Sequence, residues 1–330
     1  MYKIGSASLD VTYKCNLRCN HCFNSSGAPI KCEMSDEKLI EIVESLAHLK
    51  VSSLCFFGGE TLLKYDVITK MAKKFKDVFP KGAVNLVSNG LLFNREKAEG
   101  LKNAGISLIQ FSLDGISDDS YDFIRNSNGK LSKVLESITI AKKAGLNVGI
   151  ACLPHKKNLS EINSIIDYCI EHGVFELRFQ PFMPLGRGDD NFNKISLNRD
   201  EYKELLKIID EGKIKILSKS SELKIEWGDP LDHFYMLREV DYIPYININA
   251  YGEILLSPYL PLKMWDLNKA SLENYIEENI PKNVLGISLV KEVLEGIFSV
   301  RDMNLSKFNL PKIFMQENID LLEMMESGRN

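Results

Sequence analysis

The sequence lacks a surplus of positive charge and long apolar runs. Its 330 residues include 41 Lys and Arg against 45 Asp and Glu, a formal net charge of −4. Proteins that bind nucleic acid through its phosphates need a Lys/Arg surplus, so this composition excludes that class. No apolar run reaches the roughly 18 residues of a membrane-spanning helix, and residues 1–10 lack a signal-peptide pattern. We therefore expect a cytoplasmic protein without nucleic-acid or membrane partners.

Cysteine is scarce outside one short stretch. Three of the seven cysteines fall within residues 15–22, whereas Cys32, Cys55, Cys152 and Cys169 are scattered. An odd number without pairing argues against a disulfide framework and indicates a reducing compartment. Because no cysteine follows Cys169, the rest of the chain offers no thiolate to a metal centre.

Cys15, Cys19 and Cys22 follow an apolar run at residues 8–13 that has the character of a strand, so we expect them on a loop. Thiolates bind iron-sulfur clusters and zinc, and three of them leave one iron of a cubane without a protein ligand. A structural zinc site needs four ligands. The rival interpretation is a zinc module that recruits Cys32 or His21 as the fourth ligand.

The CxxxCxxC spacing, with His21 before the last cysteine, resembles the signature of the radical S-adenosylmethionine (radical SAM) enzymes. The resemblance implies one [4Fe-4S] cluster on the three cysteines. It also implies that S-adenosylmethionine binds the open iron and is cleaved by one electron to a 5'-deoxyadenosyl radical. An external one-electron donor such as flavodoxin or ferredoxin would be a partner.

Short apolar strands alternate with amphipathic helices through the first half of the chain. We place strands near residues 8, 53, 83, 108, 147 and 175, and a helix after Ser35 as its N-cap. This βα repetition predicts parallel strands with ligands at their carboxyl ends. The resemblance implies a partial (βα)6 barrel; periodicity alone leaves an open doubly wound sheet equally possible.

Candidate site residues lie at these strand ends. By resemblance Gly58, Gly59 and Glu60 bind the methionyl amino group, and Asn89, Ser112 and Asp114 line the cofactor wall. Arg125 matches a position that approaches the carboxylate, although a solvated arginine at a helix end is an alternative. The Asn-Gly and Asp-Gly pairs that include Asn89 and Asp114 are equally typical of turns.

Two later strands carry further candidates. Cys152 shares a predicted strand face with Val148 and Ile150; it is either a small core residue or a hydrogen-atom donor to a substrate radical. Arg178 and Gln180 alternate toward one face of an apolar strand, and we assign Gln180 to cofactor binding. Residues 186–193 are rich in Gly, Asp and Asn and predict a loop at a domain boundary.

We expect domains at residues 1–190 and 191–330, the second a smaller α+β domain. Its predicted elements are a helix from Ser196 to about residue 212, a strand at 223–227, a hairpin at 243–256 and helices at 284–298 and 317–325. The hairpin resembles the start of a SPASM or twitch domain. Ser257 stands where that domain has a cysteine, so we expect the scaffold without its auxiliary cluster.

The resemblance therefore implies a radical SAM enzyme that acts on a peptide. In the family, an auxiliary cluster is thought to accept the electron when the substrate is oxidised. Its absence favours a redox-neutral reaction such as epimerisation, and oxidative crosslinking remains an alternative. Alternatives are a sugar or other small-molecule substrate, an activase that makes a glycyl radical on a partner enzyme, and the zinc module. A leader peptide could dock along residues 223–256 by strand addition.

Overall fold

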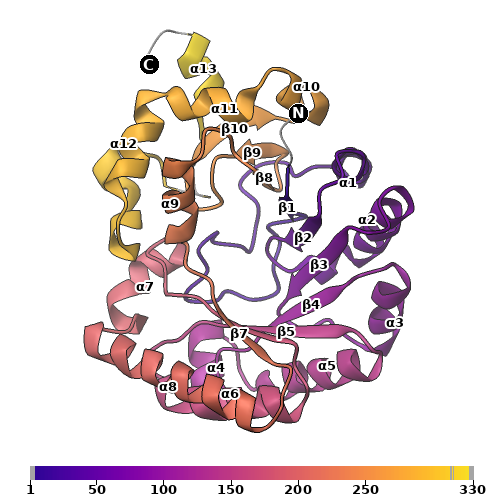
Figure 1. The fold of residues 1–330 in the computed structure, drawn as a ribbon, viewed down its shortest axis with the longest axis vertical. Helices are drawn as coiled ribbons and strands as arrows, with labels where there is room; N and C mark the ends of the chain where they lie inside the picture. The colour runs from indigo at the N-terminus through magenta and orange to yellow at the C-terminus, as the bar shows by residue number, and fades with distance from the viewer. Residues whose placement is uncertain (1–3, 313, 315, 327–330) are drawn as a thin grey trace. The chain divides into compact units, whose positions relative to one another are not determined.

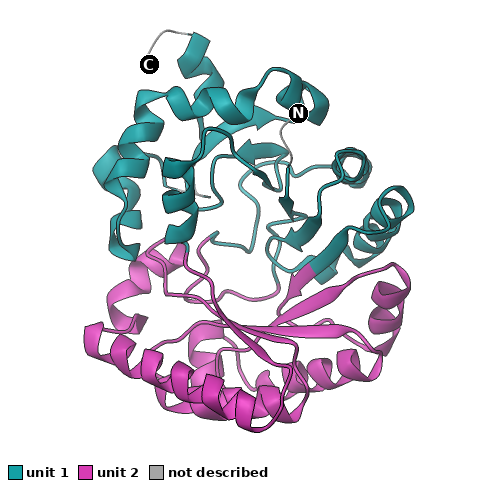
Figure 2. Ribbon diagram, viewed as in Figure 1, with its two compact units in different colours: residues 1–15, 24–85, 230–330 teal, residues 16–23, 86–229 magenta. Residues whose placement is uncertain are grey.

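The structure is a computed structural model that describes residues 4–312, 314 and 316–326 (Figure 1). Its chain forms two compact units, which Figure 2 distinguishes by colour. Unit 1 comprises residues 1–15, 24–85 and 230–330, and unit 2 comprises residues 16–23 and 86–229. The boundary that we predict near residue 190 stays a prediction, since compactness alone does not define a domain.

Parallel pairing forms the centre of the unit 1 sheet. β1 (Ser6–Asp10) pairs in parallel with β2 (Ser53–Phe57) on one side and with β8 (Tyr245–Ile248) on the other. The order continues from β8 through β9 (Glu253–Leu255) and β10 (Leu262–Asp266) to β11 (Ile319–Asp320). The β8–β9 and β9–β10 pairs are antiparallel. The predicted hairpin is therefore confirmed, and it extends a parallel sheet.

Four parallel strands form the sheet of unit 2. Their order is β4 (Leu108–Ser112), β5 (Asn147–Cys152), β6 (Glu176–Phe179) and β7 (Lys224–Trp227). β3 (Ala83–Ser88) is divided between the units after Asn85. Strands thus lie close to all six places that the sequence predicts, with β7 at the seventh, and every connection between consecutive strands of β4–β7 contains a helix.

Helices connect the strands in both units. In unit 1 they are α1 (Asp36–His48), α2 (Tyr65–Val78), α9 (Leu231–Glu239), α10 (Leu272–Glu277), α11 (Ile280–Asn283), α12 (Ser288–Gly296) and α13 (Leu321–Glu326). In unit 2 they are α3 (Arg95–Asn103), α4 (Asp118–Arg125), α5 (Leu131–Lys143), α6 (Ile162–Glu171), α7 (Arg187–Ile195) and α8 (Arg199–Ser218). Within unit 2, α5, α6 and α8 lie on one side of the β5–β7 strands (Figure 1). Each of these three helices buries an apolar face.

Helix α1 begins as the sequence predicts. The Ser35 side chain accepts a hydrogen bond from the backbone N–H of Lys38, which satisfies one of the donors left open at a helix start. Leu39, Ile42 and Val43 then form its buried face. The capping residue and the helical periodicity indicate the same start, so the sequence is sufficient to predict where α1 begins.

The predicted loop at residues 186–193 is wrong, because most of it is the first part of α7. Gly186 has a φ of 53° and precedes the helix, while Asp189 and Asp190 occupy its first turn. Acidic residues stabilise the positive end of a helix dipole, so the same residue types that indicate a loop also suit a helix start. Ile195 at the end of α7 packs with Ile124, Leu153 and Phe182 in a buried cluster.

Three other predicted helices need corrected bounds. The helix expected from Ser196 begins at Arg199, is capped by Asn198 and runs to Ser218. The helix expected at 284–298 divides into a 3-10 turn (Val284–Gly286) and α12, because Ile287 has extended backbone angles. The helix expected at 317–325 follows the short strand β11 and forms α13. Among the described residues, no helix combines the length and apolar character needed to span a bilayer.

The start of α8 can be tested by substitution. Asn198 accepts from the N–H groups of Asp200 and Glu201, and the Glu201 carboxylate accepts from the Asn198 N–H at 2.6 Å. Asn198→Ala should therefore lower the free energy of unfolding by about 1 kcal/mol. Guanidinium denaturation monitored by circular dichroism measures this change. Ser196→Ala is the matched control and should change it by less than about 0.5 kcal/mol; the opposite ranking would restore Ser196 as the cap.

Candidate active site

The turn after β2 packs directly against the segment that leads into Cys15. In unit 1 the Gly59 N–H donates to the Thr12 carbonyl at 2.6 Å, and the Glu60 N–H donates to the Lys14 carbonyl at 2.9 Å. A Cβ on Gly58 would lie 2.2 Å from the Thr12 oxygen, and the Gly58 φ of 130° is also one that other residues rarely adopt. Glycine is therefore required here, both for the approach and for the conformation.

Two further contacts of this turn are also with backbone groups. Glu60 is fully buried, and its carboxylate accepts from the Leu62 N–H at 3.0 Å, so it caps the 3-10 turn Thr61–Lys64. Asn24 donates from Nδ2 to the Gly58 carbonyl at 3.3 Å. The predicted binding of the methionyl amino group by Gly58, Gly59 and Glu60 stays a prediction, with the turn now placed beside the approach to Cys15.

The other two cysteines lie in unit 2, on a loop that is held by its backbone. The Asn20 N–H donates to the Ile124 carbonyl at 2.9 Å, and Arg187 donates from Nε to the Cys19 carbonyl, also at 2.9 Å. The Arg187 N–H donates to the Cys22 carbonyl at 3.1 Å. The loop is therefore held through backbone carbonyl and N–H groups.

Arg125 joins the loop to a buried carboxylate. Its guanidinium forms an ion pair with Asp114 and lies 3.8 Å from the Cys19 sulfur through Nη1. Burial would lower the pKa of Arg125, but Asp114, Cys19 and Tyr121 together raise it above its usual value. A permanent positive charge beside Cys19 favours the thiolate, which is the form that binds metal.

Two histidines flank this ion pair in neutral form. Burial, together with the charge of Arg125, lowers the pKa of His21 to about 3. Burial also lowers the pKa of His155, whose Nδ1 accepts from the Lys157 N–H at 3.3 Å and whose Nε2 lies 3.2 Å from the Asp114 carbonyl. That carbonyl can only accept, so His155 carries its proton on Nε2.

The other predicted residues of unit 2 lie at strand ends, as expected. Asn89 follows β3 and donates to the Asn16 side chain, the residue next to Cys15, at 2.7 Å. Ser112 ends β4 and Cys152 ends β5. The Gln180 N–H donates to the Cys152 carbonyl at 3.2 Å, which makes these two residues neighbours.

Cys152 is a buried thiol, 1% exposed. The Asn158 amide nitrogen lies 3.9 Å from its sulfur, and burial raises its pKa well above the ordinary value. Val148, Ile150 and Cys152 are all buried, which fits the predicted shared face, although Gly149 between them is buried as well. A thiol that keeps its proton suits both a core residue and a hydrogen-atom donor.

Three further residues contribute contacts to the site, and the sequence did not predict them. Glu33 accepts from the Thr12 hydroxyl at 2.8 Å, Arg187 binds the cysteine loop, and Asn158 donates to the Asp114 carbonyl at 2.8 Å. Glu33 and Asn158 are polar residues in irregular segments, where no periodicity marks a partner. Arg187 had a signal, since it follows Gly186 directly, but we interpreted that stretch as a domain boundary.

The donor chemistry fits an iron-sulfur cluster. Three thiols occur within eight residues, and the Arg125 charge beside Cys19 offsets the negative charge that thiolates bring. Among the described residues, no three His, Cys, Asp or Glu side chains form a compact metal-ion site. Cys15 belongs to unit 1 and Cys19 and Cys22 to unit 2, so the three-ligand set stays a prediction from donor chemistry.

The Arg125–Asp114 pair should be the most sensitive polar contact of unit 2. Arg125→Met leaves the Asp114 carboxylate buried and unpaired, so the free energy of unfolding should fall by about 3–5 kcal/mol. Adding Asp114→Asn should recover part of this loss, because an amide oxygen can still accept from the Leu153 N–H, now at 2.7 Å. Guanidinium denaturation of the three chains measures both changes.

An exposed ion pair provides the control for this comparison. Lys203 and Asp200 lie 2.7 Å apart with side chains 64% and 87% exposed. Lys203→Met should change the free energy of unfolding by less than about 0.5 kcal/mol. Equal losses in Lys203→Met and Arg125→Met would contradict the importance of the buried pair.

Comparison with known proteins identifies the domain. Residues 9–169 match the family model of the radical SAM superfamily. The sporulation killing factor maturation protein SkfB of Bacillus subtilis is 28% identical over 232 residues, 69% of this chain and 51% of the relative. A GTP 3',8-cyclase of Lactiplantibacillus plantarum is 32% identical over 213 residues, 62% of this chain and 60% of the relative. The chain thus spans about half to three fifths of the length of these relatives.

Solved structures confirm the fold class. Streptococcus suis SuiB bound to S-adenosylmethionine superimposes with a TM-score of 0.71 at 15% identity, covering 91% of this chain and 74% of SuiB. The enzyme anSMEcpe with bound AdoMet gives a TM-score of 0.65 at 17% identity, covering 98% and 94% of the two chains. The fold is an α/β partial barrel with a C-terminal part of the kind expected. Radical SAM domains use a [4Fe-4S] cluster and S-adenosylmethionine, and residues 9–169 of this chain match the model of that superfamily.

Proposed function

We propose that this protein is a radical SAM enzyme that modifies a peptide. Cys15, Cys19 and Cys22 would hold one [4Fe-4S] cluster, which supplies the electron that converts S-adenosylmethionine to a 5'-deoxyadenosyl radical for hydrogen abstraction. The observation that carries the proposal is the three-thiol loop near the beginning of a radical SAM domain. An external one-electron donor such as flavodoxin or ferredoxin would reduce the enzyme.

The chain's own residues would prepare the site for this chemistry. Arg125 would keep Cys19 in its thiolate form, and the turn of Gly58, Gly59 and Glu60 would offer backbone groups to the methionyl amino group. Asn89, Ser112 and Asp114 would line the same cofactor wall, and His21 and Gln180 would also contact the cofactor. Because His21 is neutral, it adds no charge to that already supplied by Arg125.

We favour a peptide substrate because several similar proteins are named for, or solved with, peptides. SkfB matures a sporulation killing factor, SuiB is known with the precursor peptide SuiA, and anSMEcpe with the peptide Cp18Cys. The similarity to GTP 3',8-cyclases supports the alternative of a small molecule. The C-terminal hairpin supports the peptide-modifying alternative, because it resembles the start of a SPASM or twitch domain.

The proposed outcome is redox-neutral, and epimerisation is the simplest case. Hydrogen abstraction from an α-carbon would be followed by donation from the Cys152 S–H. The S–H bond breaks, a C–H bond forms, and the thiyl radical regains one electron from the external donor and one proton from solvent. Crosslinking would instead require that the substrate lose two electrons, and no cysteine after Cys169 is present to hold a second cluster.

Metal analysis of anaerobically reconstituted protein tests the cluster. We expect about four iron and four sulfide per chain and formation of 5'-deoxyadenosine on reduction with S-adenosylmethionine. Alanine at Cys15, Cys19 or Cys22 should abolish all three signals. Cys32→Ala is the matched control, because Cys32 is exposed and should leave iron unchanged. Zinc without sulfide, lost again in Cys32→Ala, would replace this proposal with the zinc module.

Substitution of Cys152 tests the proposed donor. With a peptide substrate in D2O, epimerisation should place one deuterium in the product, and Cys152→Ala should stop product formation while 5'-deoxyadenosine still forms. Cys169→Ala is the control, because Cys169 is also a buried free thiol but lies on α6. Normal product from Cys152→Ala would leave Cys152 as a core residue only.

A further inference from the structure

Unit 1 contains a pocket that is lined by none of the proposed cofactor-binding residues. Its volume is about 160 Å³, and its walls come from segments that are far apart in sequence. Tyr13 precedes Cys15; Ser25, Ala28 and Ile30 follow Cys22; Tyr251 and Phe314 come from the hairpin tip and the C-terminal part. Asn24 completes the lining and donates to the Gly58 carbonyl. The pocket is therefore built on the residues that flank the cysteine loop on both sides.

Aromatic rings form its walls. The Tyr13 ring meets those of Tyr251 and Phe314 edge-to-face, with centroids 5.2 and 5.4 Å apart. Tyr13 is itself fixed, since its hydroxyl donates to Asp10 at 2.9 Å. Ring edges and faces arranged in this way can accept another aromatic ring in offset or edge-to-face contact.

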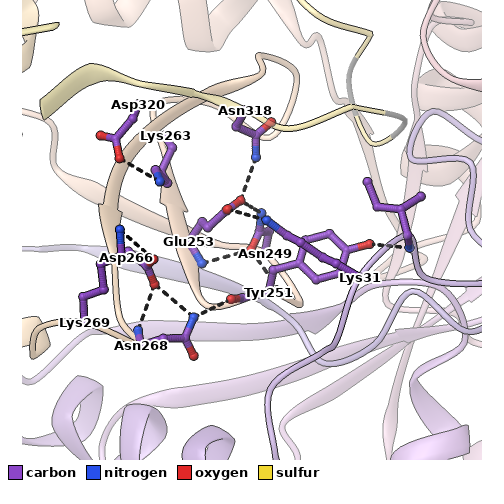
Figure 3. A network of polar contacts seen from close by, with 11 residues as sticks. Lys31, Asn249, Tyr251, Glu253, Lys263, Asp266, Asn268, Lys269, Asn318 and Asp320 are labelled. Carbon is purple, nitrogen blue, oxygen red and sulfur yellow. Dashed lines mark hydrogen bonds and ion pairs between the residues drawn. The ribbon is translucent and has the colours of Figure 1, made fainter. Parts of the chain in front are cut away.

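A network of polar contacts holds the walls in place (Figure 3). The Ile30 N–H donates to the Tyr251 hydroxyl at 3.0 Å, and the Lys31 ammonium lies 2.7 Å from Glu253 and over the Tyr251 ring. Asn249 and Asn318 donate to the other carboxylate oxygen of Glu253, at 2.7 and 2.8 Å. The pocket thus has a defined shape before any ligand arrives, which lowers the entropic cost of binding.

Ser25 is the unusual residue of the lining. Its hydroxyl is buried and has no hydrogen-bond partner, and its backbone is left-handed with a φ of 49°. Phe314, on the same pocket, also has a positive φ, 60°. A buried hydroxyl without a partner is destabilising, and left-handed non-glycine residues are uncommon and cluster at functional sites. A ligand with a polar atom would satisfy the Ser25 hydroxyl.

Size and charge limit what the pocket can hold. A cavity of roughly 150 Å³ accommodates one benzene ring, so a nucleotide or a tetrapyrrole is too large. None of the described residues that line it is charged, and Lys31 nearby is already paired with Glu253. A phosphate or carboxylate would lose its hydration here without a charged partner.

We propose that this pocket binds one tyrosine side chain of the peptide substrate. The phenol ring lies against Tyr13 and Tyr251, and its hydroxyl meets the Ser25 hydroxyl. That the bound peptide is a substrate rests on the proposed function, whereas the binding of a tyrosine side chain does not. It adds a residue preference that the cofactor site cannot supply.

Blocked tripeptides test the pocket on the full chain. Acetyl-Gly-Tyr-Gly-amide, its Phe and Ala counterparts and GTP are titrated separately and followed by ligand-observed NMR. We expect the Tyr peptide to bind more tightly than the Phe peptide and at least tenfold more tightly than the Ala peptide. Equal affinity for the Ala peptide, or GTP as the tightest ligand, would overturn the proposal.

Substitutions at the pocket locate the binding. Ala28 is exposed at the rim, so Ala28→Phe should fill the pocket and weaken the Tyr peptide at least tenfold, while Ala28→Ser stays within twofold. Ser25→Gly suits the positive φ and removes the hydroxymethyl side chain; it should weaken the Tyr peptide about threefold to tenfold and change the Phe peptide by less than twofold. Thermal unfolding checks that the variants remain folded. Binding that is insensitive to Ala28→Phe would overturn the assignment.

The two proposals fail in different ways. Cleavage of S-adenosylmethionine in the absence of peptide measures the radical chemistry alone. If no 5'-deoxyadenosine forms but the Tyr peptide binds and Ala28→Phe prevents it, the proposed function is wrong and the pocket assignment stands. If 5'-deoxyadenosine forms and no tripeptide binds, the pocket assignment is wrong and the chemistry stands.

Discussion

The approach of Gly58 and Gly59 to the backbone of Thr12 and Lys14 is the constraint on which the rest of unit 1 depends. It brings the end of β2 against the chain that enters Cys15, at a distance where no side chain fits. Two N–H donors then fix the direction in which that chain leaves β1. Every later feature of unit 1 that concerns the cysteine loop, including the pocket around Tyr13, begins from this fixed segment.

In unit 2 the main constraint is the burial of charged side chains. Arg125 is stabilised by Asp114, and Asp114 in turn accepts from the Leu153 N–H at the end of the next strand. Buried neutral histidines on either side add no charge. The result is a guanidinium beside Cys19 that is paired with a carboxylate, and strand ends and α4 place it rather than the loop itself.

The sequence predicted an element correctly where a local capping or turn residue and the hydrophobic periodicity indicated the same structure. The six strands, the Ser35 cap and the hairpin turn depend on neighbours in the chain, and all were predicted within a few residues. The start of α8 was missed because Ser196 and Asn198 are both good caps, and only the contacts of Asn198 with Asp200 and Glu201 distinguish them. Helix α7 was missed because acidic residues and glycine suit loops and helix starts alike.

Long-range contacts were beyond such reasoning. Nothing in the residues around Glu33 indicates that its carboxylate meets Thr12, and nothing near Tyr251 indicates that Phe314 shares a wall with it. The candidate site was predicted in its chemistry, by residue type and spacing, but not in its contacts. The division of the three cysteines between two compact units also has no local signal.

During synthesis, one edge of β1 stays unpaired for a long time. β1 pairs with β2 within the first 57 residues, yet its other edge is covered only by β8 at Tyr245–Ile248. Apart from residues 16–23, unit 2 is one continuous stretch that ends at Asp229, so it can form before β8 exists. During synthesis the open edge of β1 is therefore exposed for nearly two hundred residues, roughly 10–40 s at ordinary elongation rates. Open strand edges promote association between chains, which makes this interval the one in which a nascent chain most needs a chaperone.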